Sequence, residues 1–575
     1  MSMTFEQALD QVGSFGRFQY FLIFYLCLLV VPLRVIPLSV HIFTLLEPPH
    51  WCKNPYLEIR GYTQEQIKNY SIPLKHSDHY HYSKCKMYDY NWESWDASRW
   101  PEFNDSSKVM PCKYGYVYDY SNVYPTIISE NDWVCGDTYK AYIANSVFFA
   151  SMSIGVLAIG HIGDIVGRVP VMFVTYALAG LTGIFTYFSG GSFELFVITR
   201  FVMGFVLLSI SITPFVLAVE YVPKQRRMLV LSAFRFVYPV VGVFVPWIAY
   251  ASGYWRTLQL LNVVPCCIAA PLSYFIPESS RWLLSKGKLE ETKQILHKIA
   301  RWNGNRVDPN AFDTLELPIS EKKNQMNVLA IWKYPRLRRN ILLTFFIWVN
   351  ACLVYSAGQL YAAQVTPSPF LMTSATNGVD ILATAVAMPL ADFWGRKPSM
   401  VLFYMLSSVA YFVIGCLPYE FTMMFVLLMV GRFALTMAYN VGYLYAAEIY
   451  PTEIRSQILS VRQAFGSIGK FLSSQIVMLA YYGPYIPLLI FGGVSGSTAL
   501  MAIPLPETLH QDLPETLEDA ENMTGLPRSC VFACPGAPPP ENVEGATGVS
   551  PAVRHRARTL SAVSAATVDS TSPEM

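Results

Sequence analysis

Residues 164–170 read DIVGRVP, and residues 392–398 read DFWGRKP. Both stretches have the pattern Asp-x-x-Gly-Arg-x-Pro, and they begin 228 residues apart (392 − 164 = 228). A second pair keeps this offset, because EYVPKQRR begins at Glu220 and EIYPTEIR begins at Glu448 (448 − 220 = 228). Self-similarity at one offset is the mark of an internal repeat. We therefore expect the chain to consist of two homologous halves.

Two further pairs of motifs extend the repeat. PES at 277–279 matches PET at 506–508 with an offset of 229 (506 − 277 = 229). ITRF at 198–201 matches VGRF at 430–433 with an offset of 232 (430 − 198 = 232), which indicates a small insertion or deletion between the halves. Four pairs of motifs at nearly one offset are not expected by chance.

The composition indicates a membrane protein. Of the 575 residues, 53% are hydrophobic and 14% are charged, whereas about a quarter of the residues in a soluble domain are charged. Long apolar runs such as FQYFLIFYLCLLVVPL approach the ~20 residues that cross a bilayer as a helix. The net charge of +2, without a dominant basic face, gives no indication of a nucleic-acid partner. Twelve spans are expected, near residues 17–45, 139–160, 169–189, 193–219, 229–252, 256–276, 339–361, 370–391, 399–418, 421–447, 457–481 and 484–504.

The predicted fold is an all-α membrane protein with twelve transmembrane helices in two pseudo-symmetric six-helix bundles. Residues 1–276 form the N-terminal bundle, including a polar loop at 47–138, and residues 339–505 form the C-terminal bundle. A polar linker at 277–338 joins them. The tail at 506–575 is rich in Pro, Ser, Thr and Ala, a composition typical of disordered segments.

Basic residues predict the orientation of the spans. The short loops after even-numbered spans contain Arg168, Arg227, Arg396 and Arg455, while the short loops after odd-numbered spans read SGGS, TPSP, LPYE and YYGP. Because Lys and Arg concentrate in cytoplasmic loops, we expect both termini in the cytosol and the 47–138 loop outside the cell.

The 47–138 loop has two features of an extracellular segment. It contains an even number of cysteines, which oxidise outside the cell, and two Asn-x-Ser acceptors for glycosylation, at Asn69 and Asn104. Four cysteines allow three pairings, and the sequence does not choose among them. The predicted disulfide cysteines are Cys52, Cys85, Cys112 and Cys135.

The repeated motifs suit the cytosolic ends of neighbouring spans. Glycine permits a tight turn, and proline suits the first turn of the next helix. The acidic and basic residues around them are placed to pair across the loops. One interpretation is a salt-bridge cluster that only stabilises the fold, and the other, which we favour, is a gate that breaks when the conformation changes. The candidate gating residues are Asp164, Gly167, Arg168, Glu220, Arg227, Asp392, Gly395, Arg396, Glu448 and Arg455.

These motifs carry a resemblance to known transporters. Gly160, Asp164, Gly167 and Arg168 resemble the loop signature of the major facilitator superfamily. The segments FEQALDQVGSFGRFQ, PCKYGYVYDYSN, IISENDWVCGD, PESSRWLLSKGK and AAEIYPTEIR look like the organic cation, carnitine and organic anion transporters of solute carrier family 22. The resemblance implies alternating access, in which two bundles move around a site near the middle of the membrane. The chain departs from the signature at Val169, where a second base is usual, and at Met388, where the second copy usually has glycine.

Charged side chains inside the expected spans are candidate functional residues, because burying a charge in a membrane costs a few kcal/mol. Arg34, Asp380 and Lys470 lie near the middle of spans. For Asp380 the alternative is a buried ion pair with Lys470 and no contact with substrate. For Arg462, nearer the cytosolic end, the alternative is a side chain that reaches the lipid headgroups.

The resemblance adds further positions to the expected substrate site. Arg235, Trp348 and Tyr355 match positions that line the cavity in relatives, and Asn440 is a polar site position. Aromatic rings in such cavities bind organic ions by stacking and cation–π contacts, although most aromatic residues in this chain are expected to be core or lipid-facing. Ser467 stands where cation transporters of the family typically have Asp and anion or carnitine transporters have Arg.

The expected function is transport of small organic ions across the plasma membrane, without a cofactor. The sequence has no G-x-x-x-x-G-K-[ST] phosphate loop for an ATP-driven pump, and the linker offers no nucleophile–base pair of an enzyme. Because three bases at the expected site oppose one acid, a carboxylate-bearing anion or a carnitine-like zwitterion is favoured. An organic cation transporter is the alternative, and a membrane sensor or scaffold with a transporter fold is the alternative of another class. The coupling ion is left open.

Overall fold

A computed structural model describes most of the chain before its C-terminal tail. The described residues are 3, 5–13, 15–74, 82–93, 103, 107–223, 226–308, 311–312, 315, 328–365, 368–416, 421–451, 454–509, 511 and 513–523. Asn104 and most of the predicted tail, from residue 524 onward, lie outside these residues.

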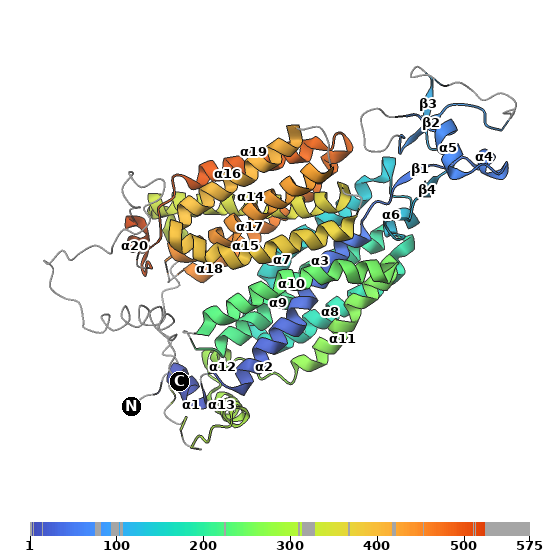
Figure 1. Ribbon diagram of the computed structural model, residues 1–575. Coiled ribbons are helices and arrows are strands. Elements are labelled where there is room, and N and C mark those ends of the chain that lie inside the picture. The colour runs from blue at the N-terminus through green and yellow to red at the C-terminus, as the bar shows by residue number, and fades with distance from the viewer. Residues whose placement is uncertain are drawn as a thin grey trace, which may run out of the picture. The chain divides into compact units, whose positions relative to one another are not determined.

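The described residues form twelve long helical rods, as the sequence predicts. The first half contains α2 (Arg17–Tyr25), η1 (Leu26–Val30) and α3 (Val31–Thr44) as one continuous rod, then α7 (Tyr139–Val166), α8 (Arg168–Phe188), α9 (Phe193–Glu220), α10 (Arg227–Ser252) and α11 (Trp255–Ser273). The second half contains α14 (Pro335–Val365), α15 (Pro369–Trp394), α16 (Arg396–Cys416), α17 (Phe421–Ile449), α18 (Arg455–Met478) and α19 (Tyr485–Ala502). The all-α fold of two six-helix bundles is confirmed (Figure 1).

Ten of the twelve rods have the length and hydropathy of membrane spans, and the other two are α11 and α18. These two helices are long enough to cross a bilayer but carry polar side chains that face the protein interior. Gln259 and Asn262 of α11 are buried, and so is Arg462 of α18. The lower hydropathy of α11 and α18 therefore reflects polar groups enclosed by neighbouring helices, as is usual for polar residues inside a membrane.

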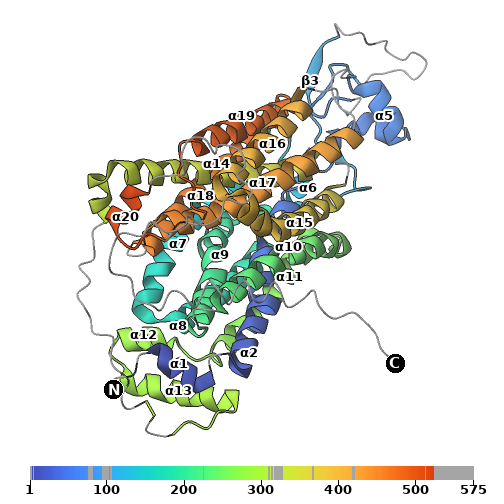
Figure 2. The ribbon, with the colours of Figure 1, turned by 60° about the vertical axis from the view of Figure 1, so that its left-hand side comes forward.

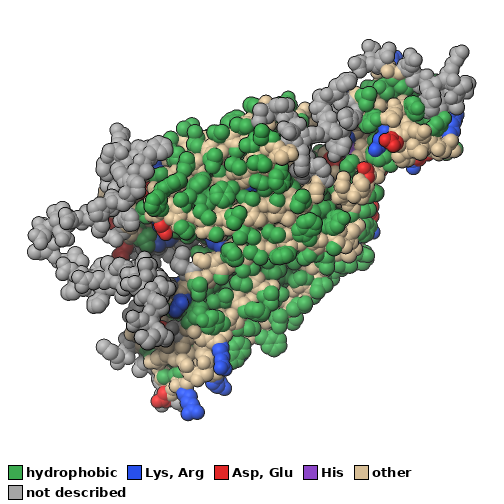
Figure 3. Space-filling view, in the orientation of Figure 1, with side chains coloured by type: hydrophobic (Ala, Val, Ile, Leu, Met, Phe, Trp, Pro, Cys, Tyr) green, Lys and Arg blue, Asp and Glu red, His purple; other side chains and the backbone are tan. Residues whose placement is uncertain are grey.

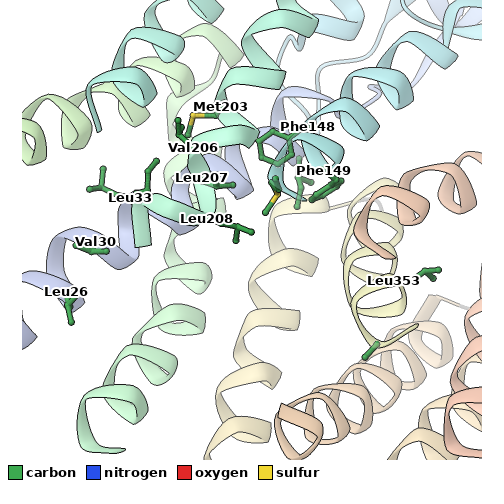
Figure 4. Close-up of a cluster of buried hydrophobic side chains, with 14 of the residues drawn as sticks. Leu26, Val30, Leu33, Phe148, Phe149, Met203, Val206, Leu207, Leu208 and Leu353 are labelled. Carbon is green, nitrogen blue, oxygen red and sulfur yellow. The ribbon is translucent and has the colours of Figure 1, made fainter. Parts of the chain in front are cut away.

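The N-terminal bundle closes around an apolar core. Leu33 of the first rod lies near Leu207 of α9, and the same buried cluster includes Leu26, Val30 and Phe148 of α7 (Figure 4). Small residues let some helices approach closely, as is common in membrane bundles. A Cβ added at Gly155 of α7 would lie 1.8 Å from the carbonyl oxygen of Phe205 on α9.

The two bundles contact each other near the end that carries the 47–138 loop. Helix α10 packs on α15, and α7 packs on α18. Ser374 Oγ donates to the carbonyl oxygen of Val243 at 2.9 Å, and Gln475 Nε2 donates to Ser146 Oγ at 2.6 Å. Toward the opposite end the surface is hollowed between the bundles, and Lys and Arg side chains are visible there (Figure 3).

The 47–138 loop forms a small folded layer. Its elements are β1 (His50–Cys52), α4 (Pro55–Ile59), α5 (Gln64–Ser71), β2 (Lys86–Tyr88), β3 (Val109–Pro111), β4 (Tyr116–Tyr118), α6 (Ile127–Glu130) and η2 (Cys135–Asp137). Strand β1 pairs antiparallel with β4, and β2 with β3. The four predicted cysteines form two disulfides, Cys52–Cys112 and Cys85–Cys135. Asn69 is exposed, as a glycosylation acceptor requires.

Short helices gather at the end opposite the 47–138 loop. They are α1 (Phe5–Gly13), α12 (Ser280–Ser285) and α13 (Leu289–Asn303), and both ribbon views place them side by side (Figures 1 and 2). Helix α13 buries Leu296 and Ile299 and packs on α1. The remaining short elements are η3 (Ser189–Gly191), η5 (Val328–Lys333), η6 (Leu479–Tyr481) and α20 (Leu517–Asn522).

The prediction of a wholly disordered tail from residue 506 is wrong for its first residues. Tyr445 donates its hydroxyl to the carbonyl oxygen of Pro506 at 2.8 Å, and α20 follows. Glu521 of α20 accepts the backbone N–H groups of Arg336 and Leu337, at 3.1 and 2.7 Å, at the start of α14. A carboxylate at a helix N-terminus satisfies free donors, which holds this part of the tail on the C-terminal bundle.

Candidate functional site

A buried ion pair lies between α15 and α17. The Asp380 carboxylate accepts Arg432 Nε at 3.0 Å and Arg432 Nη2 at 2.7 Å, and the two side chains are 4% and 3% exposed. Thr436 Oγ1 donates to the same carboxylate at 2.6 Å, and the Tyr355 hydroxyl donates at 2.9 Å. A carboxylate offers about four acceptor sites. Asp380 is therefore saturated by protein donors.

The predicted alternative pair between Asp380 and Lys470 does not form among the described residues, because Arg432 takes the place of Lys470. In the sequence, Arg432 was assigned only to the repeated VGRF motif, so its pairing with Asp380 was missed. A signal was available, since an arginine inside an expected span needs a partner. Asp380 is the nearest acid in the sequence that an expected span also contains.

Four aromatic rings form a row beside this ion pair. Tyr355 stacks on Tyr439 with ring centroids 5.2 Å apart, Tyr439 lies 4.5 Å from Trp348, and Trp348 lies 6.0 Å from Tyr443. The structure therefore links the two predicted aromatic residues, Trp348 and Tyr355, through Tyr439, which the sequence analysis missed. Tyr439 and Tyr443 are four apart on α17 and share one helix face.

Guanidinium groups cover this aromatic row. Arg432 lies 3.6 Å from the Tyr355 centroid, Arg462 lies 3.9 Å from that of Trp348, and Arg235 lies 3.9 Å from that of Tyr443. Arg235 belongs to α10, so its contact with Tyr443 of α17 joins the two bundles. Such contacts are worth about 0.5–2 kcal/mol each.

The headgroup interpretation of Arg462 is wrong. Its side chain is 2% exposed and donates from Nη2 to the carbonyl oxygen of Gly442 at 3.0 Å. The ring of Trp348 holds the guanidinium inside the C-terminal bundle.

Three predicted bases lack a carboxylate partner among the described residues. Arg34 donates to Ser211 Oγ at 3.3 Å and lies 5.4 Å from the Tyr238 ring. Lys470 of α18 is half-buried, and no salt bridge of its ammonium group occurs among the described residues. Arg235 has only the aromatic contact described above. Positive charge therefore exceeds negative charge in this region, because Asp380 is already neutralised by Arg432.

The two remaining predicted site residues have different surroundings. Asn440 donates from Nδ2 to Thr384 Oγ1 at 3.2 Å and is partly exposed. Ser467 is fully buried, and its hydroxyl has no hydrogen-bond partner in the described part of the chain. No described contact joins Ser467 to the aromatic row.

The repeated loop motifs form one ion cluster in each half. In the first half, Arg168 lies 2.9 Å from Asp164 and 3.6 Å from Glu220. In the second half, Arg396 lies 2.9 Å from Asp392 and 3.2 Å from Glu448. Each cluster lies within one bundle, and each aspartate is mostly exposed.

The PES and PET motifs complete the two clusters. Glu278 accepts the backbone N–H groups of Arg168 and Val169 at 2.9 and 3.0 Å, and Glu507 does the same for Arg396 and Lys397 at 3.0 Å each. These carboxylates satisfy the free donors at the starts of α8 and α16. Gly167 and Gly395 of the loop motifs leave room for these two carboxylates.

Gly167 and Gly395 have φ of +114° and +98°, values that other residues rarely adopt. A Cβ added to them would lie 2.5 Å from Glu278 Oε2 and 2.9 Å from Glu507 Oε2, respectively. The tight turn and the capping carboxylate therefore occupy the space that a side chain would need.

Arg227 and Arg455 stand outside these ion clusters. Each donates from Nε to a carbonyl oxygen five residues earlier, to Val222 at 3.2 Å and to Tyr450 at 3.0 Å. Arg227 also lies 3.6 Å from a carboxylate oxygen of Glu6. Both arginines thus bind the chain after the preceding helix rather than the Asp–Arg–Glu clusters.

Among the described residues, one group of side chains has the spacing of metal ligands, but its chemistry does not support a metal site. His50 lies beside Cys85 and Cys135. The two sulfur atoms are bonded to each other, so they are not thiolates that could hold an ion. Burial lowers the pKa of His50, which keeps its imidazole neutral at neutral pH.

Comparison with known proteins agrees with this architecture. The model of the family described as "Sugar (and other) transporter" matches residues 69–520. Organic anion transporter 3 of Oryctolagus cuniculus is 30% identical over 535 residues, which cover 90% of this chain and 94% of that protein. Organic cation/carnitine transporter 2 of Homo sapiens is 27% identical over 533 residues, which cover 91% and 95%.

A solved structure shows the same fold. The inward-open xylose transporter XylE of E. coli superposes with a TM-score of 0.51 at 17% identity, covering 67% of this chain and 89% of that chain. The protein is thus a membrane transporter with the major facilitator fold and not an enzyme. It belongs to solute carrier family 22 of the major facilitator superfamily.

The saturated ion pair predicts an asymmetric response to mutation. Asp380→Ala leaves the Arg432 charge buried without a partner, which costs about 3–5 kcal/mol. We expect a large loss of folded protein, measured by fluorescence-detected size-exclusion chromatography of a tagged chain. The double variant Asp380→Ala/Arg432→Leu removes both charges and is expected to recover part of the monodisperse peak.

If the single and the double variant lost the same amount of folded protein, the role of Asp380 would not be limited to compensating the charge of Arg432. Asp392→Ala is the matched control, because Asp392 is an exposed acid that also pairs with an arginine. Its removal is expected to change stability by less than about 1 kcal/mol.

Proposed function

We propose that the protein transports a small carboxylate-bearing organic anion by alternating access. The observation that carries this proposal is the excess of positive charge around the aromatic row. Arg34, Arg235 and Lys470 have no carboxylate partner in the described part of the chain, and Asp380 has no acceptor site left for a substrate. At an effective dielectric constant of 20, a pair of opposite charges ~4 Å apart is worth about 4 kcal/mol.

The aromatic row favours an anion over a simple cation. A cation would bind the ring faces, yet Arg432, Arg462 and Arg235 already cover three of the four rings. A zwitterion that places its ammonium group on Asp380 is also disfavoured, because Arg432 neutralises that carboxylate. The names of the relatives include both organic anion and organic cation/carnitine transporters, and the charge distribution supports the first class.

The gating clusters support alternating access. The bundles contact each other near the 47–138 loop and are hollowed between them at the opposite end (Figure 3). Asp164, Arg168 and Glu220, with their counterparts Asp392, Arg396 and Glu448, lie at that opposite end. We place them as the elements that fix the loops between helices while the bundles move. The cell membrane proposed is the plasma membrane, with both termini in the cytosol.

Lys470→Ala tests the charge of the substrate. The variant is expected to lower uptake of labelled organic carboxylates into proteoliposomes by about tenfold or more, since 1.4 kcal/mol of lost binding is already tenfold. Lys288→Ala is the matched control, because Lys288 forms an exposed ion pair with Glu291. The proposal would be wrong if wild type took up tetraalkylammonium ions better than carboxylates and if Lys470→Ala increased that uptake further. The protein would then be an organic cation transporter. Binding without accumulation would indicate a sensor.

Asp164→Asn tests the gate. Its exposed ion pair contributes little to stability, about 0–1 kcal/mol, so surface expression is expected to stay near wild type while the rate of uptake falls several-fold. Glu291→Gln, which removes another exposed acid, is expected to leave both unchanged. A parallel loss of surface protein and uptake in Asp164→Asn would show that the cluster only stabilises the fold.

The orientation is tested at Asn69. If the 47–138 loop is outside the cell, treatment with a glycosidase is expected to shift the mobility of wild type on a gel. The shift should be smaller in Asn69→Gln. Reaction of the loop with a membrane-impermeant reagent only after permeabilisation would overturn the orientation.

A further inference from the structure

A buried arginine of the N-terminal bundle has no carboxylate partner among the described residues. Arg200 lies on α9, and its residue is 3% exposed. Its Nε and Nη2 atoms have no hydrogen-bond partner in the described part of the chain. The ring of Phe196 lies 4.5 Å from the guanidinium carbon.

The second half of the repeat shows what Arg200 lacks. The ITRF and VGRF motifs align Arg200 with Arg432, and Asp380 precedes Arg432 by 52 residues. The loop motifs at the ends of α7 and α15 keep an offset of 228, so the counterpart of Asp380 is Met152 (380 − 228 = 152), which carries no charge. No ion pair of Arg200 occurs in the described residues. An uncompensated buried charge costs several kcal/mol.

A small cavity lies against this guanidinium. Its volume is about 10 Å³, and it is lined by Pro37, Val40, Thr182, Gly183, Thr186, Arg200, Met203, Gln259 and Asn262. A cavity of this volume holds about one water-sized particle. It is too small for an organic substrate, so it is separate from the substrate site proposed above.

The other polar groups around the cavity leave few donors for an occupant. Thr182 and Thr186 donate their hydroxyls to backbone carbonyl oxygens at 2.6 and 2.7 Å, and Gln259 donates to Thr44 Oγ1 at 3.0 Å. The amide of Asn262 has an oxygen without a partner, and rotation of the amide would present its NH₂ group instead. Arg200 and Asn262 are therefore the groups available to an occupant.

We propose that this cavity binds a monatomic halide anion of chloride size, which acts as the counter-ion of Arg200. A single water molecule would satisfy N–H groups but would leave the positive charge uncompensated. A halide satisfies both requirements, and a cavity this small excludes polyatomic organic anions. The anion is a structural component of the N-terminal bundle, and its binding does not depend on which substrate is transported.

Thermal unfolding of the purified full-length chain in detergent tests this site. Sodium chloride and sodium bromide are compared with sodium gluconate at constant ionic strength, because gluconate is too large for the cavity. A ligand that binds only the folded state raises the melting temperature as its concentration exceeds Kd. We expect a saturable rise on the order of 1–2 °C in either halide, because the shift per kcal/mol falls as the chain grows longer.

Arg200→Gln assigns the effect to this cavity. The variant is expected to lose the halide dependence and, because the buried charge is gone, to melt in gluconate at or above the temperature of wild type. Lys470→Ala, which removes a base of the other site, is expected to keep the halide dependence. A halide effect that persists in Arg200→Gln, or that disappears in Lys470→Ala, overturns the proposal.

Bromide provides a test that does not need a variant. Crystals of wild type grown in bromide are expected to show an anomalous difference peak beside the Arg200 guanidinium. A cavity without this peak, or a wild-type melting temperature that is the same in chloride and gluconate, would mean that water alone fills it.

Discussion

The cost of a charge inside a membrane bundle decides how this molecule is arranged. A guanidinium buried there loses its hydration, so it needs a carboxylate, an aromatic face, a carbonyl group or a ligand. Arg432 finds Asp380, whereas Arg462 finds the ring of Trp348 and the Gly442 carbonyl group. Arg235 and Lys470 find no carboxylate in the described part of the chain. This difference separates charges that are paired within the described residues from charges that we propose meet a substrate.

The same constraint explains why the two halves of the repeat are not equivalent. The C-terminal half contains a saturated Asp–Arg pair, while Arg200 of the N-terminal half faces a small cavity. In the ion clusters of the loop motifs the second copy is also tighter. Arg396 contacts Glu448 through both Nε and Nη2, and Thr508 donates to the same carboxylate at 2.6 Å. The single Arg168–Glu220 contact at 3.6 Å is longer.

The loop motifs also cap helices, because backbone N–H groups at the start of a helix need acceptors. The carboxylates of Glu278, Glu507 and Glu521 each accept two N–H groups at the first turn of a long helix. A charge-assisted hydrogen bond of this kind is stronger than a neutral one. Segments that follow a bundle in the sequence are thereby tied back to it. The first residues of the predicted tail are ordered for this reason, although their composition is typical of a disordered segment.

The sequence by itself determined the features that depend on pattern. Offsets of 228 between loop motifs showed two homologous halves, and apolar runs located twelve helices, including α11 and α18, whose polar residues lower their hydropathy. Loop motifs also identified the partners Asp164 and Arg168, which are four residues apart and therefore meet on adjoining turns. These features are local, so the sequence contains the information needed to find them.

Only the tertiary structure decided which distant groups meet. The pairing of Cys52 with Cys112 depends on how the 47–138 loop folds. The choice of Arg432 rather than Lys470 as the partner of Asp380, and the lack of an ion pair for Arg200 among the described residues, depend on how each helix is rotated in its bundle. A turn of about 100° per residue separates neighbouring positions on a helix, so a small change in rotation exchanges one partner for another. Span boundaries read from hydropathy do not define that angle, and the packing of the helices does.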